Sequence, residues 1–183
     1  MNFISRADRA VIHFIDKHMA CRFMDKFMPA MTMLGDLGIV WMITAIFLIP
    51  MRRYRIYGIS MIVIVLVSAF LGDIVIKPLV RRMRPFVKNK TIRLIIRNPG
   101  GYSFPSGHTS SSVGAAYVLL QMNLWVGIAG IIVAGLIAFS RVYLHVHYPT
   151  DIFAGAVLGL ICGILILSFI FHLSFLSVIP VAG

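Results

Sequence analysis

The chain has 183 residues, a length typical of one domain, but 60% of them are hydrophobic and only 13% are charged. Soluble globular chains are about 45–50% apolar and about 25% charged. The composition, with a mean hydropathy of +0.94, therefore predicts an all-α integral membrane protein and excludes intrinsic disorder. The formal net charge is +11 and all six acids are Asp, which excludes metal sites that depend on Glu. Among partners for so basic a chain, an anionic lipid or a phosphate-bearing substrate fits an apolar protein better than nucleic acid.

The N-terminal region has the pattern of an amphipathic helix. Apolar residues recur at three- and four-residue steps from Ile12 to Phe27, and charged residues fill the positions between them. We expect residues 5–28 to form one helix that lies in the membrane interface. A signal peptide is not expected, because Arg and Asp interrupt each apolar run in this region.

Five apolar stretches follow and predict about five transmembrane helices, at residues 29–50, 56–76, 106–121, 124–144 and 149–172. A bilayer core needs roughly 20 helical residues, so four stretches are long enough and the third is short. A polar segment, residues 81–104, separates the second stretch from the third. Because spans alternate in direction, the end of the second, the start of the third and the junction of the last two share one membrane face.

Three polar clusters fall at these three places. They are Lys77 with Arg84-Pro85, the run Pro105-Ser106-Gly107-His108, and Ser140-Arg141 followed by His147 and Asp151. If the second helix continues beyond its apolar part, Lys77, Arg81 and Arg84 lie on one side of it.

Singly, each cluster has a structural explanation: cations that end a span, a helix cap, or an interfacial histidine. Asp73 is either a partner for Lys77 or part of a site, and the sequence leaves both open. Together, the cations, a helix N-terminus and two histidines predict a site for a tetrahedral oxyanion. A histidine backed by a carboxylate suits a nucleophile, and a second histidine suits a proton donor.

The three clusters, in this order and at these spacings, resemble the signature motifs of the type 2 phosphatidic acid phosphatase family, which is related to vanadium haloperoxidases. The resemblance implies one membrane-embedded phosphatase domain over residues 1–183, with its motif-bearing core at residues 77–151. It also implies that Lys77, Arg84, Ser106, Gly107 and Arg141 bind the phosphate. His147 would then be the nucleophile that forms a phosphohistidine, oriented by Asp151, and His108 would be the general acid and base. No metal or other cofactor is implied.

The compact layout is most similar to short bacterial undecaprenyl diphosphate phosphatases of this family, which implies hydrolysis of that lipid to undecaprenyl phosphate. Phosphatidylglycerophosphate, phosphatidate and lipid A phosphatases share the motifs and remain alternatives. An anion channel or carrier remains an alternative of another class. We expect a multi-pass protein of the plasma membrane that acts on a lipid phosphate in the bilayer. A literal count of Lys and Arg near the span ends favours a cytoplasmic site, but phosphate binding explains several of those cations. The Arg-rich turn at residues 52–55, at the opposite end, has no such explanation, so we expect the site on the extracytoplasmic face.

Overall fold

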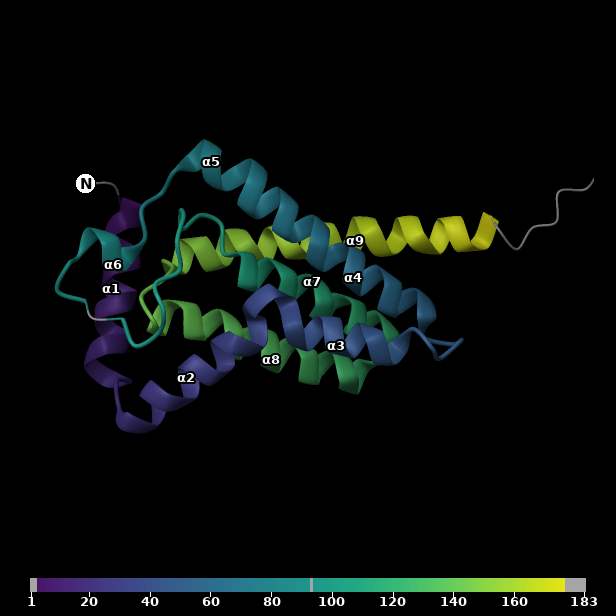
Figure 1. Cartoon of the computed structure of the whole chain (residues 1–183), viewed down its shortest axis with the longest axis horizontal. Helices are drawn as coiled ribbons and strands as arrows, with labels where there is room; N and C mark the ends of the chain where they lie inside the picture. The colour runs from purple at the N-terminus through teal and green to yellow at the C-terminus, as the bar shows by residue number, and fades with distance from the viewer. Residues whose placement is uncertain (1–2, 93, 177–183) are drawn as a thin grey trace, which may run out of the picture.

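The computed structural model describes residues 3–92 and 94–176, and every regular element within them is helical. In chain order these elements are α1 (Phe3–His18), α2 (Arg22–Gly35), η1 (Asp36–Gly38), α3 (Ile39–Leu48), α4 (Arg55–Ala69), η2 (Phe70–Ile76), α5 (Lys77–Val80), α6 (Pro85–Lys88), α7 (Gly107–Met122), α8 (Leu124–Tyr143) and α9 (Pro149–Leu176). The long helices run along the molecule, and α1 lies across one end of them (Figure 1). The predicted all-helical membrane fold is confirmed.

The transmembrane part is a bundle around α7, which packs against α4, α8 and α9. Within the described residues, four stretches are long and apolar enough to cross a membrane: Arg22–Leu48, Arg55–Lys88, Leu124–Tyr143 and Pro149–Ser174. α7 is the fifth apolar helix, shorter at 16 residues and mostly buried by the others. Large apolar side chains on the outside of the bundle are more than half exposed, among them Phe47, Leu66, Trp125, Phe153 and Leu165. Such a surface requires lipid around it, so the chain is a multi-pass membrane protein.

Close contact between α7 and α9 depends on glycines at every fourth position of α9. A Cβ atom added at Gly159 would lie 2.1 Å from the carbonyl oxygen of Ser110, and one at Gly155 would lie 2.5 Å from that of Ser106. Small residues at this spacing let two membrane helices approach closely. The approach matters for the site, because Ser106 is the N-cap of α7 and Asp151 lies in the first turn of α9.

The predicted N-terminal amphipathic helix is present as α1, but its predicted bounds, residues 5–28, are wrong. α1 ends at His18, Cys21 has an extended backbone (φ −156°, ψ 161°), and a second helix begins at Arg22. The break lets α2 turn away from α1 and pack against α8, so that α2 forms the first part of a membrane span. The local pattern continued through the break because both helices turn apolar residues, Ile15 and Met28 among them, toward the same buried cluster.

The first predicted span, residues 29–50, is also interrupted. Leu37 and Gly38 have left-handed backbones, with φ of 52° and 66°, so η1 is a tight kink between α2 and α3. Glycine adopts such a conformation at little cost, which explains Gly38 at the second position. The kink places the half-exposed Asp36 beside the N-terminal turn of α7, where its carboxylate contacts His108.

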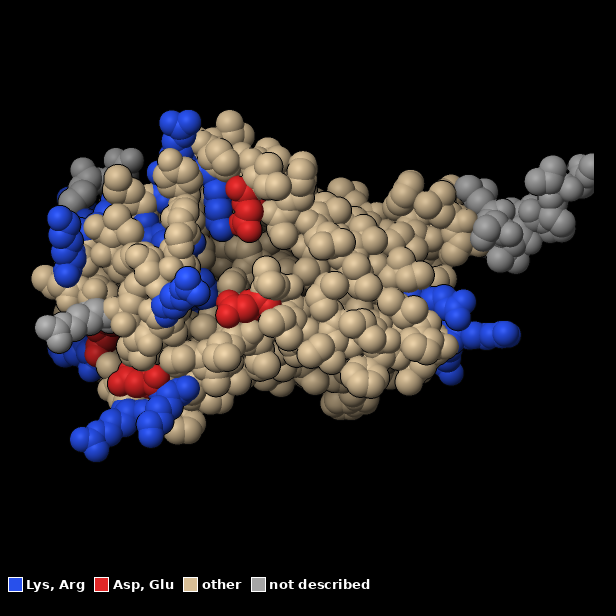
Figure 2. Space-filling model, viewed as in Figure 1, with Lys and Arg blue, Asp and Glu red and all other residues tan. Residues whose placement is uncertain are grey.

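Charged side chains gather at the two ends of the bundle, and a long surface that is largely free of charge separates them (Figure 2). One end carries α1 and the polar segment between α5 and α7, and the other carries the turn before α4 (Figure 1). The three polar clusters of the sequence meet at the first of these ends, as the alternation of spans predicted.

Candidate active site

A pocket of about 200 Å³ lies where η1, α4, η2, α7 and α8 meet. Six of the eight side chains or backbone positions predicted for the site line it, namely Lys77, Arg84, Gly107, His108, Arg141 and His147. Asp73, Leu37, Val65, Ala69, Pro99 and Ser111 are among its other walls. Of the six, Lys77 and His147 are seventy positions apart in the sequence, and the remaining two predicted residues, Ser106 and Asp151, do not line this pocket.

Lys77 begins α5, directly after the π-helical segment η2, and its Nζ atom donates to Oδ1 of Asp73 at 2.5 Å. Asp73 also lines the pocket, so it is both the partner of Lys77 and a part of the candidate site. The predicted stacking of Lys77 with Arg81 and Arg84 is wrong. The helix ends at Val80, and Arg81 has a left-handed backbone with φ 50°. Pro85 disfavours a helical residue before it, so Arg84 is extended and reaches the pocket from a separate segment.

Arg84 is buried and holds two loops together. Its guanidinium donates to the carbonyl oxygens of Val146 at 2.9 Å, Gly100 at 3.0 Å and Gly101 at 3.2 Å. One of its terminal nitrogens also lies 3.3 Å from Nε2 of His147. A guanidinium N–H cannot accept, so the contact requires that Nε2 carries the lone pair and Nδ1 the proton.

Arg141 is the second buried cation, near the C-terminal end of α8 and only 3% exposed. One terminal nitrogen donates to Oγ1 of Thr32, a residue of α2 that the sequence did not point to. Its Nε–H has no hydrogen-bond partner in the described part of the chain. A buried guanidinium with an unpaired donor on the wall of a pocket is suited to bind an anion.

His147 follows α8 and Asp151 lies in the first turn of α9, with Nδ1 of the imidazole 3.6 Å from Oδ2 of the carboxylate. That separation is longer than a hydrogen bond but within the range of electrostatic contact. His147 is almost completely buried, and this burial lowers its pKa to about 3, with Arg141 and Arg84 acting in the same direction and Asp151 opposing them. The imidazole is therefore neutral at physiological pH, as a nucleophile must be.

Ser106 caps α7 instead of lining the pocket. Its Oγ accepts from the backbone N–H of Thr109 at 3.4 Å and from the Thr109 hydroxyl at 2.9 Å. Its own N–H donates to the carbonyl oxygen of Asp151 at 3.1 Å, which joins the starts of α7 and α9. Gly107 does face the pocket, and a Cβ added there would meet only Oδ1 of Asp73, at 3.6 Å. The Ser106 hydroxyl thus belongs to the cap of α7, and its contact with phosphate stays a prediction.

His108 is paired with an acid that sequence reasoning missed. Its Nε2 lies 2.8 Å from Oδ1 of Asp36, across the kink of the first span. The ring packs so closely on α2 that a Cβ at Gly35 would lie 2.8 Å from it. The signal was present in the sequence, since an acid inside an apolar span usually has a functional partner. The two histidines of the pocket thus each have their own carboxylate.

Comparison with known proteins assigns the family. The model of the PAP2 superfamily matches residues 53–174. The transmembrane PAP2-type phosphatidylglycerolphosphate phosphatase of Bacillus subtilis has the same fold, with a TM-score of 0.75 and 24% identity over 99% of this chain and 90% of that one. The fold is thus that of a multi-pass membrane phosphatase. The chain belongs to the PAP2 superfamily.

Two relatives of known activity are similar in sequence. The undecaprenyl-diphosphatase of Sulfolobus acidocaldarius is 38% identical over 121 residues, which are 66% of this chain and 58% of that protein. The lipid A 4'-phosphatase of Bacteroides thetaiotaomicron is 29% identical over 171 residues, 87% of this chain and 75% of that protein. The chain therefore matches little more than half the length of the first relative, and the names of the two specify different lipids.

Proposed function

We propose that the protein is a metal-independent lipid phosphatase that removes the terminal phosphate of undecaprenyl diphosphate. The observation that carries the phosphatase assignment is the unpaired, buried Nε–H of Arg141 on the wall of a pocket that also contains Lys77, Arg84 and a neutral His147. The buried imidazole beside three cations is suited to attack a phosphorus atom whose oxygens those cations hold. The undecaprenyl-diphosphatase relative supports the choice of lipid.

The proposed first step is attack of His147 Nε2 on the terminal phosphorus. The phosphate takes the guanidinium N–H of Arg84 that lies 3.3 Å from Nε2, which frees the lone pair of the nucleophile. A nitrogen–phosphorus bond forms as the bond from phosphorus to the bridging oxygen breaks. The products are a phosphohistidine and undecaprenyl phosphate. The imidazole becomes positively charged, and the carboxylate of Asp151 beside Nδ1 stabilises that charge.

His108 is the proposed proton donor to the leaving oxygen and the base for the second step. Asp36 accepts from Nε2, so the donor must be the doubly protonated imidazolium of His108, and Nδ1 is the atom that transfers the proton. After the lipid phosphate leaves, the now neutral His108 takes a proton from water as the water oxygen attacks the phosphohistidine. Inorganic phosphate is released, and both histidines return to their starting states.

The pocket walls support a lipid substrate. Leu37, Val65 and Ala69 form an apolar side of the pocket between η1 and α4, and Leu37 is 89% exposed. A prenyl chain that leaves the pocket past Leu37 enters the bilayer directly. A phosphate group on a soluble carrier has no use for such an exit, so this wall favours a phosphate attached to a hydrocarbon tail.

The test is phosphate release from a panel of lipids by the purified protein in detergent. The panel contains undecaprenyl diphosphate, undecaprenyl phosphate, phosphatidylglycerophosphate, phosphatidate and lipid A, and His147→Ala is the control. We expect the highest kcat/KM with undecaprenyl diphosphate and no release by the variant. A higher kcat/KM with another lipid would show that this lipid is the preferred substrate. No phosphate release from any lipid would refute the assignment as a phosphatase.

We also propose that the pocket faces the extracytoplasmic side of the plasma membrane. The Arg52, Arg53 and Arg55 side chains at the opposite end bind no ligand in this scheme, so they are the better guide to orientation. The test uses single cysteines at Lys90 and Met51, both exposed, in a chain whose native Cys21 and Cys162 are replaced. A membrane-impermeant maleimide should label Lys90→Cys and spare Met51→Cys in intact cells. The opposite pattern would reverse the orientation.

A further inference from the structure

A buried acid connects the surface helix α1 to the proposed nucleophile. Asp8 is only 1% exposed, although α1 lies across the end of the bundle. Its Oδ1 accepts from the backbone N–H of Thr150 at 3.0 Å, and its Oδ2 accepts from the Thr150 hydroxyl at 2.8 Å. Thr150 lies in the first turn of α9, so Asp8 satisfies a free N–H at the start of a helix to which it does not belong.

Arg82 joins Asp8 to Asp151. One terminal nitrogen of its guanidinium donates to Oδ2 of Asp8 at 2.5 Å. The other donates to Oδ1 of Asp151 at 2.5 Å and to the Thr150 hydroxyl at 2.7 Å. The guanidinium also lies over the ring of Tyr148, 4.0 Å from its centroid. The fork geometry of arginine matches two carboxylates held at a fixed separation, which lysine cannot reproduce.

These contacts determine where the second oxygen of Asp151 points. Arg82 holds Oδ1, the backbone N–H of Tyr148 holds Oδ2 at 2.9 Å, and Oδ2 is the atom nearest to His147. The carboxylate is completely buried, so without Arg82 one of its oxygens would have no hydrogen bond. Its orientation toward His147 would then no longer be fixed.

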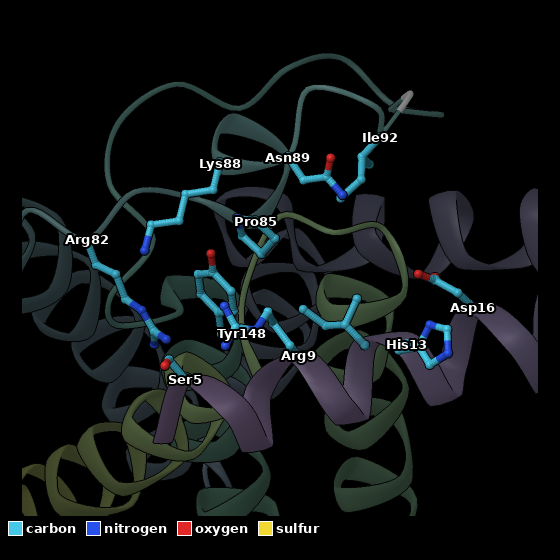
Figure 3. Close-up of a pocket in the computed structure, with 11 residues that line it drawn as sticks. Ser5, Arg9, His13, Asp16, Arg82, Pro85, Lys88, Asn89, Ile92 and Tyr148 are labelled. Carbon is cyan, nitrogen blue, oxygen red and sulfur yellow. The ribbon is translucent and has the colours of Figure 1, made fainter. Parts of the chain in front are cut away.

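A second pocket lies beside the contacts of Asp8 and Arg82. Arg82 and Tyr148 line a pocket of about 570 Å³ between α1 and residues 82–92, where the two segments stand apart (Figure 3). Arg9 and His13, on the same helix, also line that pocket (Figure 3). Asp8 lies on the same helix, and its hydrogen bonds reach Thr150 in the first turn of α9.

We propose that Asp8 and Arg82 are positioning residues that act on His147 through Asp151, which makes α1 part of the catalytic unit. The proposal rests on the proposed role of His147 as the nucleophile. Arg82 fixes Asp151, Asp8 fixes Arg82, and Asp151 keeps the proton of the imidazole on Nδ1. Loss of either outer residue slows formation of the phosphohistidine and leaves binding of the lipid phosphate nearly unchanged, because neither lines the phosphate pocket.

The test compares Arg82→Gln, Arg82→Lys and Asp8→Asn with two matched controls. Arg6→Gln removes an exposed cation from α1, and Arg81→Gln removes the exposed neighbour of Arg82. At metal sites, loss of the partner that orients a ligand typically costs about 10- to 100-fold in activity, and we take that range for a partner that orients Asp151. We expect losses of that size in kcat and in the rate of phosphohistidine formation, with KM within about threefold of the parent. Arg82→Lys should not restore the rate, and both controls should behave as the parent.

Two further readouts separate positioning from folding. The ¹⁵N shifts of the His147 ring should show less Nδ1–H tautomer in Asp8→Asn and Arg82→Gln. Combining the two changes should cost little more than Arg82→Gln alone, because both interrupt one chain of contacts. If Arg82→Gln does not fold, Asp8→Asn alone decides the question.

A parent-like rate of phosphohistidine formation in the folded variants would overturn this proposal, as would a loss that only follows the folded fraction. If the parent itself forms no phosphohistidine, the proposed role of His147 fails instead.

Discussion

The Nδ1 atom of His147 lies 3.6 Å from Oδ2 of Asp151, and the opposite ring nitrogen, Nε2, lies 3.3 Å from the guanidinium of Arg84. Nδ1 has no hydrogen-bond partner among the described residues. The imidazole is thus placed between an anion and a cation but tightly bonded to neither. We expect the Nδ1–Oδ2 distance to shorten as His147 gains positive charge during phosphoryl transfer.

The role of His108 predicts a dependence on the leaving group. His108→Asn should lose about 10²- to 10⁴-fold in kcat on the lipid diphosphate, the usual contribution of general acid–base catalysis. Burst kinetics should show a much smaller loss in the first step with p-nitrophenyl phosphate, whose leaving group needs no proton. Asp36→Asn should show the same pattern more weakly, because it acts through His108. Equal losses on both substrates in the first step would contradict the proton-donor role.

Arg141 should not be replaceable by lysine. Its guanidinium spans Thr32 and the pocket, and a guanidinium that stabilises a phosphoryl transition state contributes on the order of 10³-fold or more. We expect Arg141→Lys to lose about that much in kcat/KM and to bind vanadate correspondingly more weakly. Thr32→Val removes one hydrogen bond and should lose less than about tenfold. Substrate titrations and vanadate inhibition measure both, and a fully active Arg141→Lys protein would count against the assignment.

The buried state of His147 predicts a loss of stability in acid. In the unfolded chain the imidazole binds a proton near its usual pKa of about 6.5. In the folded protein burial lowers that pKa to about 3. The unfolded state therefore holds the extra proton between these values, so this contribution to stability is complete above pH 6.5 and is lost as the pH falls toward 3.

Thermal unfolding in detergent at pH 7 and pH 5 measures this effect. The Tm of the parent should fall more between the two pH values than the Tm of His147→Gln, which cannot be protonated. Parallel shifts in the two proteins would assign the acid sensitivity to other groups.

Much of the fold and of the candidate site could be predicted from the local sequence pattern. The apolar stretches located the long helices, and the alternation of spans placed Lys77, Gly107 and His147 at one end. Contacts between distant segments could not be predicted in this way. The contact of Asp36 with His108, for example, depends on a kink of three residues in the first span. The sequence pattern also did not predict the break in the helix at Cys21. α1 and α2 bury apolar residues in one cluster, so the helical period gave no sign that the chain had turned.

Packing of α7 against α9 should be sensitive to a single methyl group. Gly159→Ala would place a Cβ 2.1 Å from the carbonyl oxygen of Ser110, and overpacking of this kind typically costs about 1–3 kcal/mol. Gly135→Ala on α8 is the matched control, because a Cβ there meets no atom within 4 Å. We expect a lower Tm and reduced phosphatase activity only for Gly159→Ala. Equal Tm values for the two variants would show that the helices are not in close contact.

Activity should not depend on a divalent metal. Lys77, Arg84 and Arg141 line the pocket, and in the proposed mechanism they take the place of the positive charge that Mg²⁺ supplies in many phosphoryl transfers. Dialysis against EDTA should leave the rate of phosphate release unchanged, and vanadate should inhibit as a mimic of the pentacoordinate transition state. A strict requirement for added Mg²⁺ would refute the proposed mechanism.

The central claim is that His147 carries the phosphoryl group, and rapid-quench trapping tests it most directly. The protein is mixed with undecaprenyl diphosphate labelled with ³²P in the terminal phosphate, quenched in alkali within the first turnover, and digested. We predict an acid-labile, alkali-stable label on the peptide that contains His147, formed at least as fast as phosphate is released, and no label in His147→Ala. Release of phosphate without any label on the parent protein, or an equal label in the variant, would contradict the account.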